Sequence, residues 1–129
     1  MTARYVLDGT QIRTLEDFWK VIMDAFDGPG RGYFGRNLAA FADCLSGGPG
    51  HPDADEYIVD WLDHEVSRGH LGYPETVRQL EFRLARCHPT NRPAVSDDLK
   101  AAREEHGATV FDWLIEIFED RAPGVLRLQ

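Results

Sequence analysis

Hydrophobic positions along the chain fall into short β-prone runs and longer stretches with helical spacing. The clearest helical stretch follows Thr14, a residue that often caps helices, with acids in the first turn behind it. Apolar residues recur three and four positions apart at Leu15, Phe18, Trp19, Ile22, Met23 and Phe26. This spacing predicts an amphipathic helix that ends at residues 27–30, where glycine and proline gather.

Three short segments favour β-strands, at residues 4–7, 57–61 and 125–128. Between them the patterns predict helices at 38–45, 74–87, 96–105 and 110–118, with a linker over 90–93 and the last helix apolar on most sides. The resulting order is β-α-α-β-α-α-α-β. Strands separated by helical crossovers predict an α/β fold with a small three-stranded parallel sheet and helices packed on it.

Composition narrows the class of protein. The chain has 129 residues, enough for a single domain with a substantial core, and 43% of them are hydrophobic. It carries 14 basic and 22 acidic side chains, a formal net charge of −8. Such a charge repels nucleic-acid backbones, so we expect no direct nucleic-acid binding. It favours a basic protein partner, although the charge could also serve solubility alone.

The cysteines and the beginning of the chain bear on the compartment. Cys44 and Cys87 occupy apolar positions of predicted helices, which favours two buried thiols over a disulfide. Residues 1–8 include an acid and contain no long apolar run, so we expect neither a signal peptide nor a membrane segment. The expected location is the cytoplasm.

Residues 33–48 are the most informative stretch. They combine an aromatic loop, a short helix capped by Asn37 with one outward acid at Asp43, and a glycine stop. The Asn-Leu pair at 37–38 and the Asp-Cys-Leu triplet at 43–45 resemble the signature of the barstar family, intracellular inhibitors of secreted microbial ribonucleases. Residues 5–14 resemble the family's first strand and turn.

The resemblance implies a barstar-like fold of three parallel strands with helices packed on the sheet. We predict a single domain over 1–129 with a helical insert at about 62–107, a region much longer than in the best-known members. Longer relatives occur among actinobacterial sequences. The closing helix and strand fit the family more loosely.

The resemblance also implies a function: a non-enzymatic inhibitor, without a cofactor or metal, that blocks the active site of a basic extracellular ribonuclease of the guanyl-specific type. Asp43 matches the acid that mimics the substrate's phosphate and pairs with catalytic arginines and a histidine. The other matched contact positions are Tyr33, Asn37, Leu38, Ala39, Gly47, Gly48 and Glu119, with Glu116 as the alternative to Glu119. We expect a monomer when the protein is free and no membrane contact.

Departures from the family pattern leave the partner open. Ala39 stands where the best-known inhibitors carry a second acid, aromatics are absent at Ala42 and Gly48, and Arg36 adds a positive charge. Either the ribonuclease differs, or acids at 53–56 compensate, or inhibition is lost. The alternative hypothesis is a barstar-like interaction domain for a non-ribonuclease toxin or a regulatory partner.

Residues 51–64 suggest two further possibilities. His51, Asp53 and Asp55 could hold a metal, but no further ligand follows at a specific spacing, so a surface loop is favoured. A small hydrolase using the histidines and aspartates of this region would be a third hypothesis, and it predicts turnover.

Overall fold

The computed structural model describes residues 2–27, 37–47 and 56–129. Its strands are β1 (Ala3–Asp8), β2 (Tyr57–Leu62) and β3 (Leu126–Leu128). Its α-helices are α1 (Leu15–Asp27), α2 (Leu38–Leu45), α3 (His64–His70), α4 (Tyr73–Arg86), α5 (Arg92–Arg103) and α6 (Val110–Arg121), and short 3₁₀ helices occur at η1 (Gly9–Gln11) and η2 (Pro89–Asn91).

The three strands form one parallel sheet in the order β1-β2-β3. Tyr5 lies opposite Val59, and Val59 lies opposite Leu126. The central strand β2 is buried along most of its length, which explains its nearly continuous apolar sequence. The predicted α/β class and three-stranded parallel sheet are confirmed.

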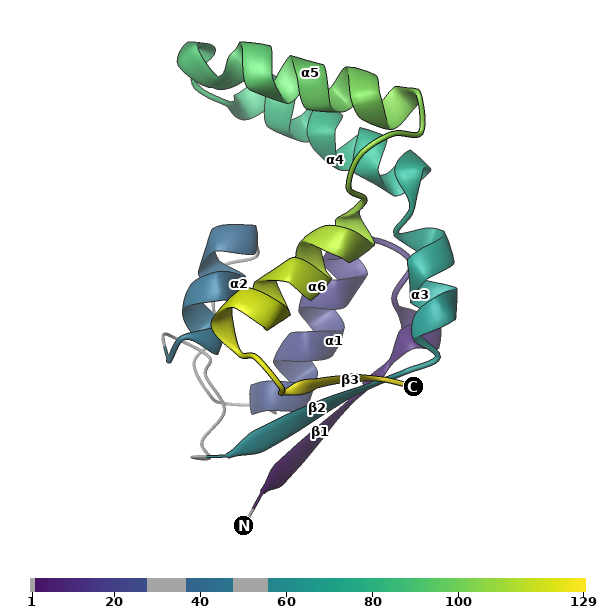
Figure 1. Cartoon of the computed structure of the whole chain (residues 1–129), viewed down its shortest axis with the longest axis vertical. Coiled ribbons are helices and arrows are strands. Elements are labelled where there is room, and N and C mark those ends of the chain that lie inside the picture. Colours follow the sequence, from purple (N-terminus) through teal and green to yellow (C-terminus); the bar gives the residue numbers. More distant parts are fainter. Residues whose placement is uncertain (1, 28–36, 48–55) are drawn as a thin grey trace.

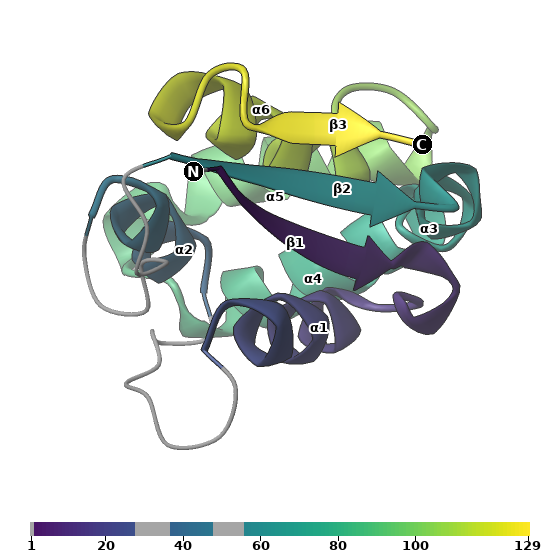
Figure 2. The same cartoon turned by 90° about the horizontal axis from the view of Figure 1, so that it is seen from below.

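The helices are layered on one side of the sheet. Figure 1 shows α1, α2 and α6 stacked above the strands, with the antiparallel pair α4 and α5 as a further layer above them. Figure 2 shows the strands from below, where no helix of the described residues crosses in front of them. The termini lie at opposite ends of the parallel strands.

Aromatic rings from several elements meet in the main core. The ring of Phe41 on α2 lies 5.3 Å from that of Phe18, 5.6 Å from that of Trp19 and 5.3 Å from that of Phe118, measured between centroids. All four side chains are buried. Edge and tilted contacts of this kind add to the stabilisation from burial itself. These ring contacts hold α2 against α1 and α6 and so fix the orientation of α2.

The predicted N-cap of the first long helix is confirmed. Thr14 Oγ1 accepts a hydrogen bond from the amide of Asp17 at 3.1 Å. Leu15, Phe18 and Ile22 are buried, as their spacing predicts. Local sequence therefore determines where α1 begins and which face it buries.

Helix α3 was absent from the predicted order. Its sequence is mostly polar, and of its residues only Ser67 is buried. The hydroxyl of Ser67 donates to the carbonyl of Gly9 at 2.8 Å and accepts from Nε1 of Trp61 at 2.9 Å. These contacts with distant segments hold α3, so no local hydrophobic period reveals it.

The linker predicted at 90–93 and the helix predicted at 96–105 were also inaccurate. Residues 89–91 form η2, and α5 begins at Arg92. Pro93 lies in the first helical turn, where its missing N–H is tolerated. A proline read as a linker residue is therefore part of the start of the helix.

Helices α4 and α5 form a hairpin around a small second core of Leu80, Val95, Leu99 and Ala102. Cys87, next to this core, is half-buried, whereas Cys44 is buried in the main core. Neither cysteine forms a disulfide. Within the described ranges, no helix combines the length and apolar character needed to cross a membrane.

Candidate partner-binding site

Helix α2 is short and is capped at both ends. The side-chain oxygen of Asn37 accepts from the amide of Ala40 at 2.8 Å, which is the predicted N-cap. At the other end the amide of Gly47 donates to the carbonyl of Cys44 at 3.2 Å, and Gly47 has φ +103°. Glycine adopts this conformation without strain, so Gly47 ends the helix as its sequence predicts.

The two faces of α2 differ sharply in environment. Phe41, Cys44 and Leu45 are buried in the main core, whereas Ala39 and Asp43 are exposed. The burial of Cys44 agrees with its predicted apolar position, while Leu38 and Ala42 are half-buried. The face that carries Asp43 is available to a partner.

Some predicted contact positions lie outside the described residues. These are Tyr33 and Gly48, and Arg36 and residues 51–55 are also outside the described ranges. Glu56, the first described residue after them, is exposed and accepts a hydrogen bond from Thr2 at 3.4 Å. The predicted positions that the structure does describe are Leu38, Ala39 and Asp43 on α2, Asn37 and Gly47 at its two ends, and Glu119 on α6.

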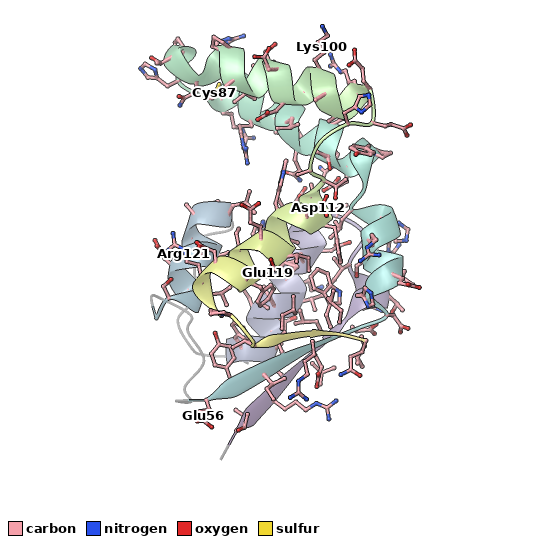
Figure 3. The ribbon with its side chains drawn as sticks, in the orientation of Figure 1. Glu56, Cys87, Lys100, Asp112, Glu119 and Arg121 are labelled. Atoms are coloured by element: carbon pink, nitrogen blue, oxygen red, sulfur yellow. The ribbon has the colours of Figure 1, made fainter. Side chains whose placement is uncertain are left out.

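Helix α6 packs beside α2, and the ends of the two helices are joined by a hydrogen bond. Arg121 Nη1 donates to Ser46 Oγ at 3.3 Å, and Figure 3 shows Arg121 reaching toward α2 while Glu119 lies on the outer surface of α6. Glu119 therefore lies on α6, the helix next to the one that carries Asp43. The last helix, predicted to be apolar on most sides, buries one face only, and its acids are exposed.

A shallow groove runs along the outer face of α6. Trp113 and Ile117 form its apolar part, and Glu116, Glu119 and Asp120 supply carboxylates. Both sequence candidates for the peripheral acid thus line one groove, together with Asp120, which the sequence analysis missed. The sequence does contain a signal for Asp120, because Glu119 and Asp120 follow Glu116 by three and four positions and so share one helix face with it.

A second groove joins α1, the start of α2 and α4. Its lining residues are Leu15, Glu16, Trp19, Asn37, Leu38, Gln79, Phe82, Arg83 and Arg86. Two predicted contact residues, Asn37 and Leu38, therefore share a surface with α4. The sequence analysis missed this stripe of α4, although its residues follow the helical spacing i, i+3, i+4, i+7.

The residues of the hydrolase hypothesis that the structure describes serve structural contacts. His64 stacks against Phe111, and its Nδ1 lies 2.9 Å from the carbonyl oxygen of Gln129. Asp60 is buried and is paired with Arg4, and its other oxygen accepts from Gln129 at 3.0 Å. Within the described ranges, no group of three or more metal-binding side chains comes together.

Residues 2–90 match the model of the family described as Barstar (barnase inhibitor). The comparison with curated proteins found no match. The family match extends from β1 through α4 and ends within η2, and it includes the whole of α2. Because it spans more than half of the chain, this protein belongs to the Barstar family of non-enzymatic, barnase-type ribonuclease inhibitors.

Proposed function

We propose that this chain inhibits a basic, secreted, guanyl-specific ribonuclease by inserting the exposed face of α2 into the enzyme's active site. Membership of the family implies a barnase-type ribonuclease inhibitor and suggests a barnase-like partner. The observation that supports the mechanism is that Asp43 is exposed on a helix whose opposite face is anchored in the aromatic core.

In this proposal Asp43 occupies the position of the substrate's phosphate and pairs with cationic side chains of the enzyme. A carboxylate on a rigid helix loses little conformational entropy when it binds, so more of the free energy of its charge-assisted hydrogen bonds contributes to affinity. Asn37, Leu38 and Gly47, with Tyr33 and Gly48, provide the shape of the contact around it. No cofactor takes part.

Acids on α6 extend the same negative surface. Glu119 would contact the periphery of the enzyme, with Glu116 and Asp120 in the same groove as neighbouring carboxylates. The net charge of −8 would draw a basic enzyme toward the site before contact. Inhibition would take place in the cytoplasm, before the ribonuclease is exported, and the free inhibitor would be a monomer.

We further propose that residues 1–129 act as one domain in which 62–107 is a family-atypical helical insert. Support comes from the sheet, which combines strands near both ends of the chain. The family match ends at residue 90 and so does not delimit the insert. The length of the chain and the α4–α5 hairpin favour the longer form known among actinobacterial members.

The alternative is a barstar-like domain that binds a non-ribonuclease toxin or a regulatory protein. The observation that favours it is Ala39, which is exposed one turn before Asp43 and leaves that part of the face uncharged. Under this alternative the same face of α2 would bind a partner with fewer cationic groups.

The test is a titration of the protein into a barnase activity assay at low salt, with Asp43→Ala and Asp97→Ala measured alongside. Asp97 is an exposed acid on α5, so its removal matches the change of charge at a site remote from α2. We expect stoichiometric inhibition by the wild type and by Asp97→Ala, and strongly weakened inhibition by Asp43→Ala. Absence of inhibition at micromolar protein would favour the alternative, and equal effects of the two substitutions would contradict the site.

A further inference from the structure

The groove beside Asn37 and Leu38 has one wall made by α4. This wall contains Phe82, Arg83 and Arg86, which we call the basic strip. Phe82 is a large apolar side chain with 46% of its surface exposed. The guanidinium groups of Arg78 and Arg86 lie over its ring, at 5.3 Å and 5.8 Å from the centroid. The strip therefore combines an exposed aromatic ring with positive charge.

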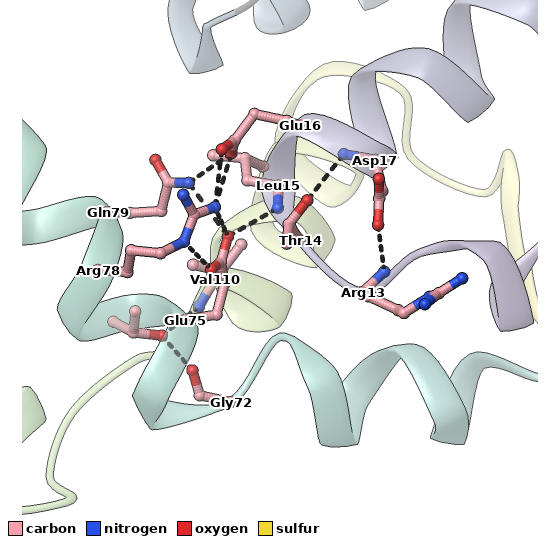
Figure 4. A network of polar contacts seen from close by, with 11 residues as sticks. Arg13, Thr14, Leu15, Glu16, Asp17, Gly72, Glu75, Arg78, Gln79 and Val110 are labelled. Atoms are coloured by element: carbon pink, nitrogen blue, oxygen red, sulfur yellow. Dashed lines mark hydrogen bonds and ion pairs between the residues drawn. The ribbon is translucent and has the colours of Figure 1, made fainter.

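The hairpin that carries the basic strip is tied to the core at the base of α4. Glu75 is buried there, and its Oε2 accepts from the amide of Leu15 at 2.8 Å, which caps the start of α1 from another helix. Arg78 donates to both Glu75 and Glu16, as Figure 4 shows. This network fixes the base of α4 beside α1, and α1 in turn packs against α2.

Two further contacts fix α4 against α6. The hydroxyl of Thr76 accepts from the amide of Val110 at 2.9 Å, and Arg83 lies over the ring of Trp113 at 5.2 Å from its centroid. Contacts to both α1 and α6 leave α4 little freedom to turn. The basic strip is thus held in a defined position next to the start of α2.

Within the part of the chain that the structure describes, no carboxylate neutralises the charges of the basic strip. Arg83 and Arg86 are exposed, and among the described residues neither has a carboxylate at ion-pair distance. Residues 73–103 carry six basic and four acidic side chains, a net charge of +2, whereas the rest of the chain carries eight basic and 18 acidic, a net charge of −10. The sign of charge thus reverses from the core to the hairpin.

We propose that the basic strip is a second contact surface for the ribonuclease bound by α2, and that it takes an acidic segment at the rim of the enzyme's active-site cleft. This inference rests on the proposed function. A uniformly basic enzyme surface would be repelled by Arg83 and Arg86, so the surface that faces them must be locally acidic. The shared groove with Asn37 and Leu38 makes the two contact surfaces continuous.

Such a contact would determine which ribonuclease is bound. Asp43 would bind the cationic groups that hold the substrate's phosphate, which guanyl-specific enzymes would share. The basic strip would contact the rim of the active-site cleft, where related enzymes can differ in charge. A like charge opposite Arg86 would reject an enzyme, and an opposite charge would select it.

The test compares the dissociation constants of wild type, Arg86→Glu, Phe82→Ala and Arg92→Glu for barnase, and for any other secreted guanyl-specific ribonuclease that the chain inhibits. Arg92, at the exposed start of α5, is the matched control, because it carries the same charge reversal within the same hairpin. Thermal unfolding of each variant checks that it is folded.

We expect Arg86→Glu to weaken binding about tenfold and Phe82→Ala to weaken it by a smaller factor, while Arg92→Glu changes it by about threefold or less. An effect of Arg86→Glu no larger than that of Arg92→Glu, or tighter binding, would overturn the basic strip as a contact. If Asp43→Ala weakens binding and Arg86→Glu does not, only this inference fails. If no ribonuclease is inhibited, the proposed function fails and this inference fails with it.

Discussion

Ala39 lies one helical turn before Asp43, and both residues are exposed on the same face of α2. Positions four apart in a helix project in nearly the same direction, so an acid at 39 would point beside the carboxylate of Asp43. The face of α2 could therefore present two adjacent carboxylates, but residue 39 is alanine and only Asp43 carries a charge. The consequence for binding can be measured directly.

We expect Ala39→Asp to tighten binding to barnase by about tenfold or more, because a second carboxylate would face the cationic groups of the cleft. The measurement is the dissociation constant at low salt. The matched control is Ala94→Asp, which adds the same charge at an exposed position of α5. An equal effect of the two substitutions would mean that charge acts only at long range and that residue 39 is not in the contact.

Association with a basic ribonuclease should slow markedly as salt is added. The protein carries a net charge of −8, and exposed charges attract over a distance of about 8 Å at physiological ionic strength. We expect the association rate constant to fall about tenfold between roughly 0.05 and 0.5 M salt, with a smaller change in the dissociation rate. Stopped-flow mixing measures both. An association rate independent of salt would contradict electrostatic attraction as the source of fast binding.

Stability should decrease in acid partly because of Glu75. Burial by itself raises the pKa of this carboxyl, but hydrogen bonds from Arg78, the Leu15 amide and Gln79, together with the charge of Arg78, bring the pKa below its ordinary value of 4.5. A folded-state pKa below the unfolded one means that the carboxylate stabilises the fold above about pH 4.5. This contribution is lost as the pH falls through the folded-state pKa.

We therefore expect Glu75→Gln to lower the free energy of unfolding at pH 7 by about 1.5–3 kcal/mol. The variant should also lose less stability than the wild type when the pH is lowered from about 5 to 3. Urea unfolding at several pH values measures both effects. Glu81→Gln, at an exposed position of the same helix, should change stability by less than about 1 kcal/mol. Parallel pH profiles for wild type and Glu75→Gln would refute this role of Glu75.

Gly9 should tolerate no side chain. It is buried in η1, and a Cβ there would overlap the backbone carbonyl oxygens of Leu62 and Asp63. Its own carbonyl accepts from Ser67, so η1 has little room to shift. We expect Gly9→Ala to destabilise the protein by about 3 kcal/mol or more, because rigid backbone atoms must move.

The control for Gly9 is Gly69→Ala, within α3, where a Cβ would meet no atom within 4 Å. Alanine is the better helix former, so this variant should be more stable by about 0.5–1 kcal/mol. Thermal unfolding of the pair compares the two. If both substitutions changed the unfolding temperature by similar amounts in the same direction, the backbone around Gly9 would be able to move and make room for a Cβ at little cost.

Several elements could be predicted from the sequence because their signals are local. The spacing of Leu15, Phe18 and Ile22 sets the buried face of α1, and the phase of α2 places Asp43 opposite Phe41. The caps at Thr14 and Asn37 act on amides within three residues of themselves. Short-range hydrogen bonds and side-chain direction within one helix depend little on the rest of the chain, so these features follow from the sequence alone.

Other features depend on residues that are far apart along the chain. Glu75 caps a helix that begins 60 residues earlier, and Ser67 holds α3 through Trp61 and Gly9. The groove between Leu38 and Phe82 exists because the hairpin is docked on α1 and α6. No periodicity within a helix encodes such contacts, since they arise only when separate elements pack. The sequence by itself determined the exposed acid of α2, and the tertiary structure decided that a basic strip lies beside it.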